Sequence, residues 1–224
     1  MMGRVVVFGC VAIVSLSAGY GGFETTLGYP GFGGLNQRFT ELHTAQPPAG
    51  WGEPGRFACR GPLWWFGGHG GGIAGPVSLG GRGAISARQD RASALEAQFA
   101  GALAGFEVGY PYAPERWFWV RPCLELVGGA WVHYVHSNES FSEPNFSRYF
   151  LAWTFGVTPA VEVMGRLRYG GESFVGLFLK PGWYVPFAGP VWTGDSDPPR
   201  FSIKGFSLQV GLRFGRYPFE PMRI

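Results

Sequence analysis

Charged residues are scarce in this 224-residue chain: 15% are Asp, Glu, Lys or Arg, against 46% hydrophobic and 17% aromatic residues. Intrinsically disordered chains have the opposite composition, so the 38 glycines and 18 prolines do not indicate disorder. The glycines keep no period of three, which excludes a collagen triple helix. Because few stretches avoid Gly or Pro for long, an all-helical fold is also disfavoured. An all-β protein rich in glycine and aromatic residues remains.

Long apolar runs are missing as well. No segment approaches 18 consecutive apolar residues, so no transmembrane helix is expected. The N-terminus has the order of a secretory signal peptide, with Arg4, an apolar run over 5–14 and small residues over 15–19. We therefore predict a signal peptide over 1–19, a single β-barrel domain over 20–217 and a C-terminal tail over 218–224.

Cysteines and clusters of positive charge are also few. Cys59 and Cys123 are the cysteines of the predicted mature chain, and they form one disulfide only if the fold brings them together. The formal net charge is +3, and no cluster of Lys and Arg indicates a nucleic-acid partner.

Period-two alternation marks candidate strands along most of the remaining chain. It is clearest near the C-terminus, where Phe206, Leu208 and Val210 alternate with small or polar residues. A membrane-crossing barrel strand shows this pattern over about 10 residues, apolar toward lipid and polar toward the lumen. Strands are predicted over 20–32, 61–73, 76–88, 95–111, 116–133, 148–168, 172–187 and 201–216. The apolar face changes parity between Leu103 and Phe106, which predicts a β-bulge at Gly105. Residues 92–104 also fit a helix.

The predicted connections alternate in length. Short ones lie over 74–75, 112–115 and 169–171, and longer ones over 33–60, 89–94, 134–147 and 188–200. Outer-membrane barrels have short periplasmic turns and longer outer loops. We therefore predict an antiparallel up-and-down transmembrane β-barrel of about eight strands with that arrangement of turns and loops. Residues 35–45 have helical spacing and are expected to form a loop helix.

The lumen of such a barrel is expected to be closed, because side chains fill the interior of eight strands. Unpaired buried charges cost several kcal/mol, so inward-facing polar residues should form paired networks. The predicted lumenal set is Arg82, Arg121, Glu125, Glu162, Arg166, Lys180, Gln209 and Arg213. Structural filling is the simpler interpretation, and a proton or ion path is the alternative.

Aromatic residues are expected to form girdles at the two membrane interfaces. The predicted outer girdle contains Trp64, Trp65, Trp131, Tyr149, Trp153, Trp183 and Tyr184. The periplasmic girdle contains Tyr110, Trp117, Trp119, Tyr169, Phe174, Phe214 and Tyr217. Trp117, Trp119 and Trp131 have the parity of Arg121 and not that of the apolar face. Packing of the aromatics in a soluble core is the alternative.

Glycine-rich alternating segments carry a resemblance to a known class of protein. They are the runs Gly67–Gly72, Gly80–Gly83, Gly105–Tyr110 and Gly205–Gly215. The pattern resembles small bacterial outer-membrane β-barrel proteins, including poorly characterised glycine-rich ones. The resemblance implies two partners, membrane lipid and the outer-membrane insertion machinery, which usually reads a C-terminal aromatic residue. Here the chain continues from Phe214 to Ile224, so Phe214 would have to serve internally.

One polar cluster raises the possibility of catalysis. His136, Ser137 or Ser140, and Glu139 match the residue types of a lipid hydrolase carried on a barrel wall. Neighbouring residues of a strand point to opposite faces, so His136 and Ser137 are not expected to meet there. His133 and His136 lack further metal ligands nearby. We therefore expect no cofactor and no metal, and catalysis is only the weaker alternative.

Three functions follow from this sequence. The first is an exported bacterial outer-membrane barrel without an open pore, whose outer loops carry a structural or surface-binding role for an unknown ligand. The second is a barrel-borne lipid-modifying hydrolase. The third is a soluble periplasmic barrel that binds a small ligand.

Overall fold

The structure is a computed structural model, and it describes residues 19–28, 62–74, 76–92, 95–115, 117–137, 147–170, 173–188, 191–194 and 204–216. Most of the predicted signal peptide, the segment 35–45, Cys59 and the tail 218–224 lie outside these residues, so those predictions stay untested. No helix in the described part of the chain is long and apolar enough to cross a membrane.

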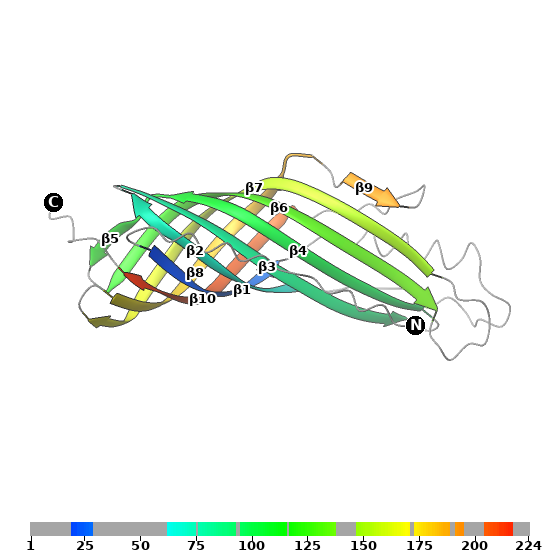
Figure 1. Cartoon of the computed structure of the whole chain (residues 1–224), viewed down its shortest axis with the longest axis horizontal. Coiled ribbons are helices and arrows are strands. Elements are labelled where there is room, and N and C mark those ends of the chain that lie inside the picture. The colour runs from blue at the N-terminus through cyan, green and yellow to red at the C-terminus, as the bar shows by residue number, and fades with distance from the viewer. Residues whose placement is uncertain are drawn as a thin grey trace.

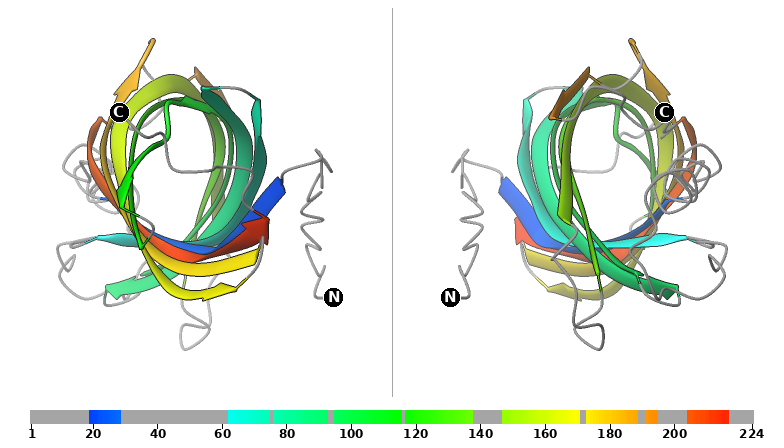
Figure 2. Two further views of the ribbon diagram at one scale, coloured as in Figure 1. Left: turned by 90° about the vertical axis from the view of Figure 1, so that its left-hand side faces the viewer. Right: turned by 90° about the vertical axis from the view of Figure 1, so that its right-hand side faces the viewer.

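Eight strands form a closed antiparallel barrel, as Figures 1 and 2 show. They are β1 (Gly19–Gly28), β2 (Leu63–Ala74), β3 (Val77–Ala92), β4 (Leu95–Gly109), β6 (Phe118–Ser137), β7 (Ser147–Gly170), β8 (Ser173–Pro186) and β10 (Gly205–Arg216). Each strand pairs with the next in this order, and β10 pairs with β1 to close the ring. The predicted up-and-down barrel of about eight strands is confirmed.

The two ends of the barrel differ in their connections. At the turn end, β2–β3 and β7–β8 are joined by short turns, and β4 leads into β6 through the short strand β5 (Tyr112–Glu115). The loop end holds the connections after β1, β3, β6 and β8. A second short strand, β9 (Val191–Gly194), pairs there with β7 (Figure 1). Residues 112–115, predicted as a turn, therefore form a strand that pairs with β6.

The connection between β3 and β4 is shorter than predicted. β3 continues to Ala92 and β4 begins at Leu95, so only 93–94 separate them, and not 89–94. The sequence shows no alternation over this extension, because Arg88, Gln89, Asp90 and Arg91 are all polar and occupy positions on both faces of β3. Period-two alternation disappears where a strand has no apolar face.

The predicted bulge at Gly105 is wrong. β3 and β4 keep one register from Ser78 and Gly109 to Ala92 and Leu95, without a shift. The large apolar residues change parity along β4 because the lumen is lined by apolar side chains toward the loop end and by charged ones toward the turn end. Buried Phe99 lines it toward the loop end, and buried Glu107 lines it toward the turn end.

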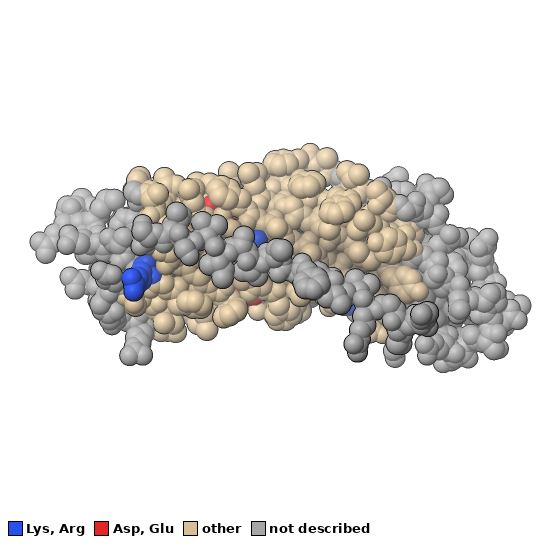
Figure 3. Space-filling view, in the orientation of Figure 1, with Lys and Arg blue, Asp and Glu red and all other residues tan. Residues whose placement is uncertain are grey.

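The outer surface is apolar over most of the height of the strands. Phe23, Leu126 and Phe155 are 71%, 51% and 62% exposed, and they are flanked by other exposed aliphatic and aromatic side chains. Figure 3 shows this surface with few charged atoms between the two ends. The side chains of alternate residues are buried in the lumen. An apolar exterior around a polar interior is the reverse of a soluble protein.

Several aromatic residues predicted for the girdles lie inside the barrel instead. Trp65, Trp119, Trp131 and Phe174 are at most 7% exposed, and Tyr184 donates or accepts a hydrogen bond with Thr154 of β7 at 2.9 Å. Their positions follow the strand parity, which places them on the same face as the charged residues. Outward-facing aromatics, including Trp64, Tyr149, Trp153 and Trp183, remain exposed as predicted.

Candidate functional site

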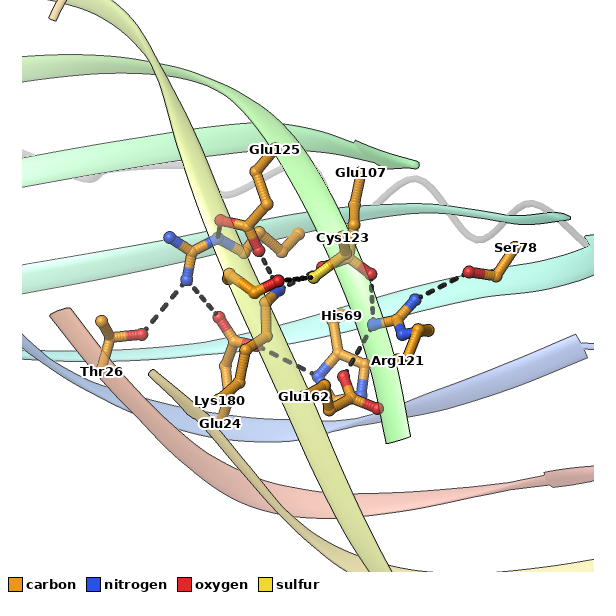
Figure 4. Close-up of polar contacts among 12 residues, drawn as sticks. Glu24, Thr26, His69, Ser78, Glu107, Arg121, Cys123, Glu125, Glu162 and Lys180 are labelled. Atoms are coloured by element: carbon orange, nitrogen blue, oxygen red, sulfur yellow. Dashed lines mark hydrogen bonds and ion pairs between the residues drawn. The ribbon is translucent and has the colours of Figure 1, made fainter. Parts of the chain in front are cut away.

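A closed ring of nine buried side chains crosses the lumen. Its members are Glu24, His69, Arg82, Glu107, Arg121, Glu125, Glu162, Lys180 and Arg213, and we call them the charge ring. Figure 4 labels all of them except Arg82 and Arg213. No side chain joined by these ion pairs is more than 10% exposed. Every one of the eight barrel strands contributes at least one member.

One half of the charge ring runs from β1 to β4. Arg82 lies 2.9 Å from a carboxylate oxygen of Glu24 and 3.3 Å from one of Glu125. It also donates a hydrogen bond of 3.2 Å to Thr26. Lys180 then donates to both Glu125 and Glu107. Positive and negative groups therefore alternate, as buried charges require.

The other half runs from β4 through β6 and β7 to β10. Arg121 pairs with Glu107 and lies 2.7 Å from Glu162. Glu162 also accepts two hydrogen bonds from Arg213, at 2.5 and 2.7 Å, in a bidentate arrangement. Such fork-like pairs are the strongest and most directional contacts between arginine and carboxylate.

His69 closes the charge ring. Arg213 donates from Nε to His69 Nε2 at 3.1 Å, and His69 Nδ1 lies 3.2 Å from a Glu24 oxygen. Because an arginine only donates, Nε2 must act as an acceptor and the ring proton sits on Nδ1, facing the carboxylate. His69 is therefore the one neutral member of the charge ring and joins Glu24 to Arg213. The other eight members are four glutamates and four cationic side chains.

Aromatic rings cover the charge ring on the side of the turn end. The Arg213 guanidinium lies 4.4 Å from the ring centre of Tyr20 and 5.1 Å from that of Phe178. Tyr20 also accepts a hydrogen bond of 3.0 Å from Arg121. Tyr20 and Phe178 pack with Trp119, Met164 and Phe174 in a buried cluster. These contacts hold the guanidinium groups in place and fill the lumen below them.

Six of the eight residues predicted for the lumenal network belong to the charge ring: Arg82, Arg121, Glu125, Glu162, Lys180 and Arg213. Gln209 is 1% exposed in the lumen, but its amide forms no hydrogen bond among the described residues. Arg166 follows Glu162 by four residues along β7, closer to the turn end, and is not a member of the charge ring.

Glu24, His69 and Glu107 were not predicted. Glu24 has the opposite parity to Phe23 and Leu27, and Glu107 lies between Phe106 and Val108, so their parity already indicated the lumen. His69 lies in a run of glycines that shows no alternation, and its direction followed only from the pairing of β2 with β1.

A small chamber lies above the charge ring, toward the loop end. Its volume is about 80 Å³. Arg82 forms part of its wall, together with the apolar side chains of Leu103 and Val127. Trp65 and Trp131 also line it, and their rings pack edge to face at 4.7 Å. The lining also includes residues that carry hydroxyl groups, namely Thr26, Thr154, Thr158, Tyr184 and Ser207.

The weak catalytic alternative receives no geometric support. His136 and Ser137 are consecutive residues of β6, where neighbours alternate between faces, and Glu139 and Ser140 lie outside the described residues. No group of His, Cys, Asp and Glu side chains in the described ranges is suited to hold a metal ion. Cys123 is a buried free thiol that donates to the Ala160 carbonyl at 3.6 Å.

Comparison with known proteins adds little. No protein-family model matches the sequence, and no curated protein matches it. Among solved structures, the beta domain of the Bordetella autotransporter Brka matches with a TM-score of 0.21 and 11% sequence identity. The match covers 91% of this chain and 100% of that chain. Since so low a score does not indicate a common fold, the barrel assignment depends on the strand pairing of this chain itself.

Proposed function

We propose that this protein is a bacterial outer-membrane β-barrel with a closed lumen, and that the connections at its loop end carry a structural or surface-binding role. The observation that supports the membrane location is the belt of exposed apolar side chains around a charged interior. An exposed apolar surface of this extent is stable only against lipid or another apolar partner. Closure of the sheet leaves none of the eight strands at a free edge, which suits the bilayer interior.

The closed lumen is supported by the charge ring. Its nine side chains come from all eight strands. The buried cluster of Tyr20, Trp119, Met164, Phe174 and Phe178 fills the space between the charge ring and the turn end. An ion entering from either side would have to separate paired, buried charges. A role as an open channel is therefore disfavoured, and a role at the membrane surface is favoured.

Membrane location is tested by fractionation and gel mobility. The full chain, expressed with its own N-terminus in a Gram-negative host, is expected in the outer-membrane fraction and requires detergent for extraction. Its mobility on a denaturing gel should change on heating, because a folded barrel resists detergent at room temperature. Recovery in the aqueous periplasm would contradict the proposal and favour the soluble barrel.

Closure of the lumen is tested by electrical recording. The purified barrel, reconstituted in a planar bilayer, should give no stepwise conductance, with a known open porin as positive control. Regular single-channel steps would contradict the closed lumen but leave the membrane location intact.

The role of the loop end is tested by exchange of a connection. Replacing 138–146 with a Gly/Ser segment of equal length should leave barrel assembly unchanged. If the role is surface binding, attachment of cells to surfaces should fall to the level of a strain without the protein. If the role is structural, envelope integrity should fall in this variant as it does in a strain without the protein. A variant with no effect in either assay would contradict a role for this connection.

A further inference from the structure

The ladder between β7 and β8 is interrupted near its middle. These strands pair at Val157 with Val185, at Ala160 with Gly182, and at Val163 with Leu179. The intervening positions, Thr158 with Tyr184, Pro159 with Trp183, Val161 with Pro181, and Glu162 with Lys180, are not paired although all of them are described. The neighbouring ladders β6–β7 and β8–β10 are continuous through the same residues. The interruption is therefore confined to one seam of the barrel.

Two prolines explain this interruption. Pro159 of β7 and Pro181 of β8 lie on opposite sides of the seam, and neither has an N–H to donate. Prolines are rare inside sheets because each one removes a ladder hydrogen bond. Since the pairing of Pro159 with Leu124 and of Pro181 with Leu208 is kept, both losses fall between β7 and β8. Here the barrel wall is held by fewer hydrogen bonds than elsewhere.

The seam separates two apolar spaces. On the lumen side, Thr158 and Tyr184 belong to the lining of the chamber. On the outer side, Pro159, Trp183 and Pro181 line a groove of about 870 Å³ whose lining is almost entirely apolar. Phe206 of β10 borders both spaces. Ala160 and Gly182, the one pair kept within the interrupted stretch, are both small residues and line the outer groove.

We propose that the seam between β7 and β8 is a lateral entry site, through which the acyl chain of a membrane lipid passes from the outer groove into the chamber. This inference rests on the proposed membrane location, because the groove then faces the bilayer. The described residues that line the groove include no charged side chain, so its natural occupant there is hydrocarbon. In the chamber the chain end meets the side chains of Leu63, Leu103 and Val127 and the two indole rings.

The acyl chain enters the chamber with its methyl end first. Arg82, the cation of the chamber wall, is already engaged by Glu24, Thr26 and Glu125, so it offers no free site for an acidic headgroup. The headgroup stays outside, in the membrane interface. On the lumen side the hydrogen bond between Thr154 and Tyr184, 2.9 Å long, joins β7 to β8 and holds the seam closed when no chain is present.

The test uses a disulfide across the seam. Val157 and Val185 are facing partners just beyond the unpaired stretch, and facing positions in a sheet suit a disulfide. The variant V157C/V185C, with Cys59 and Cys123 replaced by Ala, locks β7 to β8 when oxidised. The matched control is I85C/A102C, which locks the continuous β3–β4 ladder between facing partners of similar type. Neither pair lies in the chamber lining or the charge ring.

The probe is a phospholipid with a diazirine at the end of one acyl chain, added to vesicles of phosphatidylethanolamine and phosphatidylglycerol. After illumination, the cross-linked residues are mapped by mass spectrometry. In both reduced variants we expect labelling of the outer belt and of chamber residues such as Leu103 and Val127. Oxidation should abolish chamber labelling in V157C/V185C and leave it unchanged in I85C/A102C.

Three outcomes would overturn the entry site or its premise. Chamber labelling that survives oxidation of V157C/V185C shows entry by another route, such as the loop end. Labelling confined to outward residues shows that no chain enters. Absence of label on outward residues such as Phe23 and Leu177 shows that the barrel is not in the bilayer, which refutes the proposed function rather than the entry site alone. A second variant, P159V/P181V, restores a backbone N–H at both positions. It should also reduce chamber labelling, because the restored hydrogen bonds strengthen the seam.

Discussion

His69 and Arg213 are hydrogen-bonded to each other across an intervening strand. Gly22 of β1 lies in register with His69 of β2 on one side and with Arg213 of β10 on the other. Because Gly22 has no side chain, the imidazole and the guanidinium meet over it at 3.1 Å. The link that closes the charge ring therefore depends on a residue that takes no part in it.

Substitution of Gly22 should open the charge ring at this point. A Cβ at Gly22 would lie 1.9 Å from the Leu212 carbonyl oxygen and 2.9 Å from His69 Nε2. We expect Gly22→Ala to destabilise the barrel by about 1–3 kcal/mol, as overpacking of a filled interior does. Urea unfolding in lipid vesicles, followed by tryptophan fluorescence, measures the change. Gly21→Ala is the control, since its Cβ meets its nearest neighbour at an ordinary 3.6 Å. Equal stability of the two variants would contradict the close approach.

The chemistry of His69 is tested by a pair of substitutions of similar size. His69→Gln keeps an acceptor for Arg213 and a donor for Glu24, so it should retain most of the stability. His69→Leu removes both, so the buried Arg213 Nε and one Glu24 oxygen lose their contacts with the imidazole, at a cost of about 1–3 kcal/mol. The same unfolding measurement compares them. If Leu is tolerated as well as Gln, His69 fills space and does not link the ring.

Glu162 holds two guanidinium groups and should be the most sensitive member of the ring. Glu162→Gln leaves Arg121 and Arg213 buried with an uncompensated charge, so we expect a loss of about 3–5 kcal/mol or failure to assemble. Arg216→Gln, at an exposed position of β10, should change stability by less than about 0.5 kcal/mol. Heat-dependent gel mobility measures assembly for variants too unstable to unfold reversibly. A stable Glu162→Gln barrel would show that the ring is not required.

Trp64 and Trp65 are consecutive residues with opposite environments. Trp65 is 3% exposed and packs against Trp131 in the lumen, whereas Trp64 is 53% exposed on the outer surface. Trp65→Ala should cost about 3–5 kcal/mol because it leaves a cavity, and Trp64→Ala should cost clearly less. Quenching by brominated lipid gives an independent check, since it should depend on Trp64 and hardly on Trp65. The reverse order of either effect would contradict the register of β2.

Much of the barrel could be predicted from period-two alternation, because one face of each strand is apolar and the other small or polar. Alternation failed where that contrast is missing. The loop end of β3 has polar residues on both faces, and the loop-end half of the lumen is lined by residues such as Phe99 and Trp131, which look like exterior residues in the sequence. The prediction of a bulge at Gly105 and of Trp131 in a girdle has this common cause.

The charge ring was only partly predictable. The alternation of each strand places its charged residues on the lumen side. Which of them form ion pairs depends on how far each strand is displaced along its neighbour. Lys180 reaches Glu107 and Glu125 across the lumen and not along the sheet, so no spacing in the sequence indicates those pairs. The interrupted seam was also missed, because Pro159 and Pro181 become neighbours only once β7 and β8 are aligned.

The spread of the charge ring over all eight strands has a consequence for assembly. A partly inserted sheet that lacks any one strand also lacks a ring member, so at least one carboxylate or cation within it has lost a partner. Partial assemblies are therefore penalised whichever strand is absent, and the full benefit of pairing arrives only when β1 meets β10. The charge ring thus couples the closure of the barrel between β1 and β10 to the complete pairing of the charged side chains in its lumen.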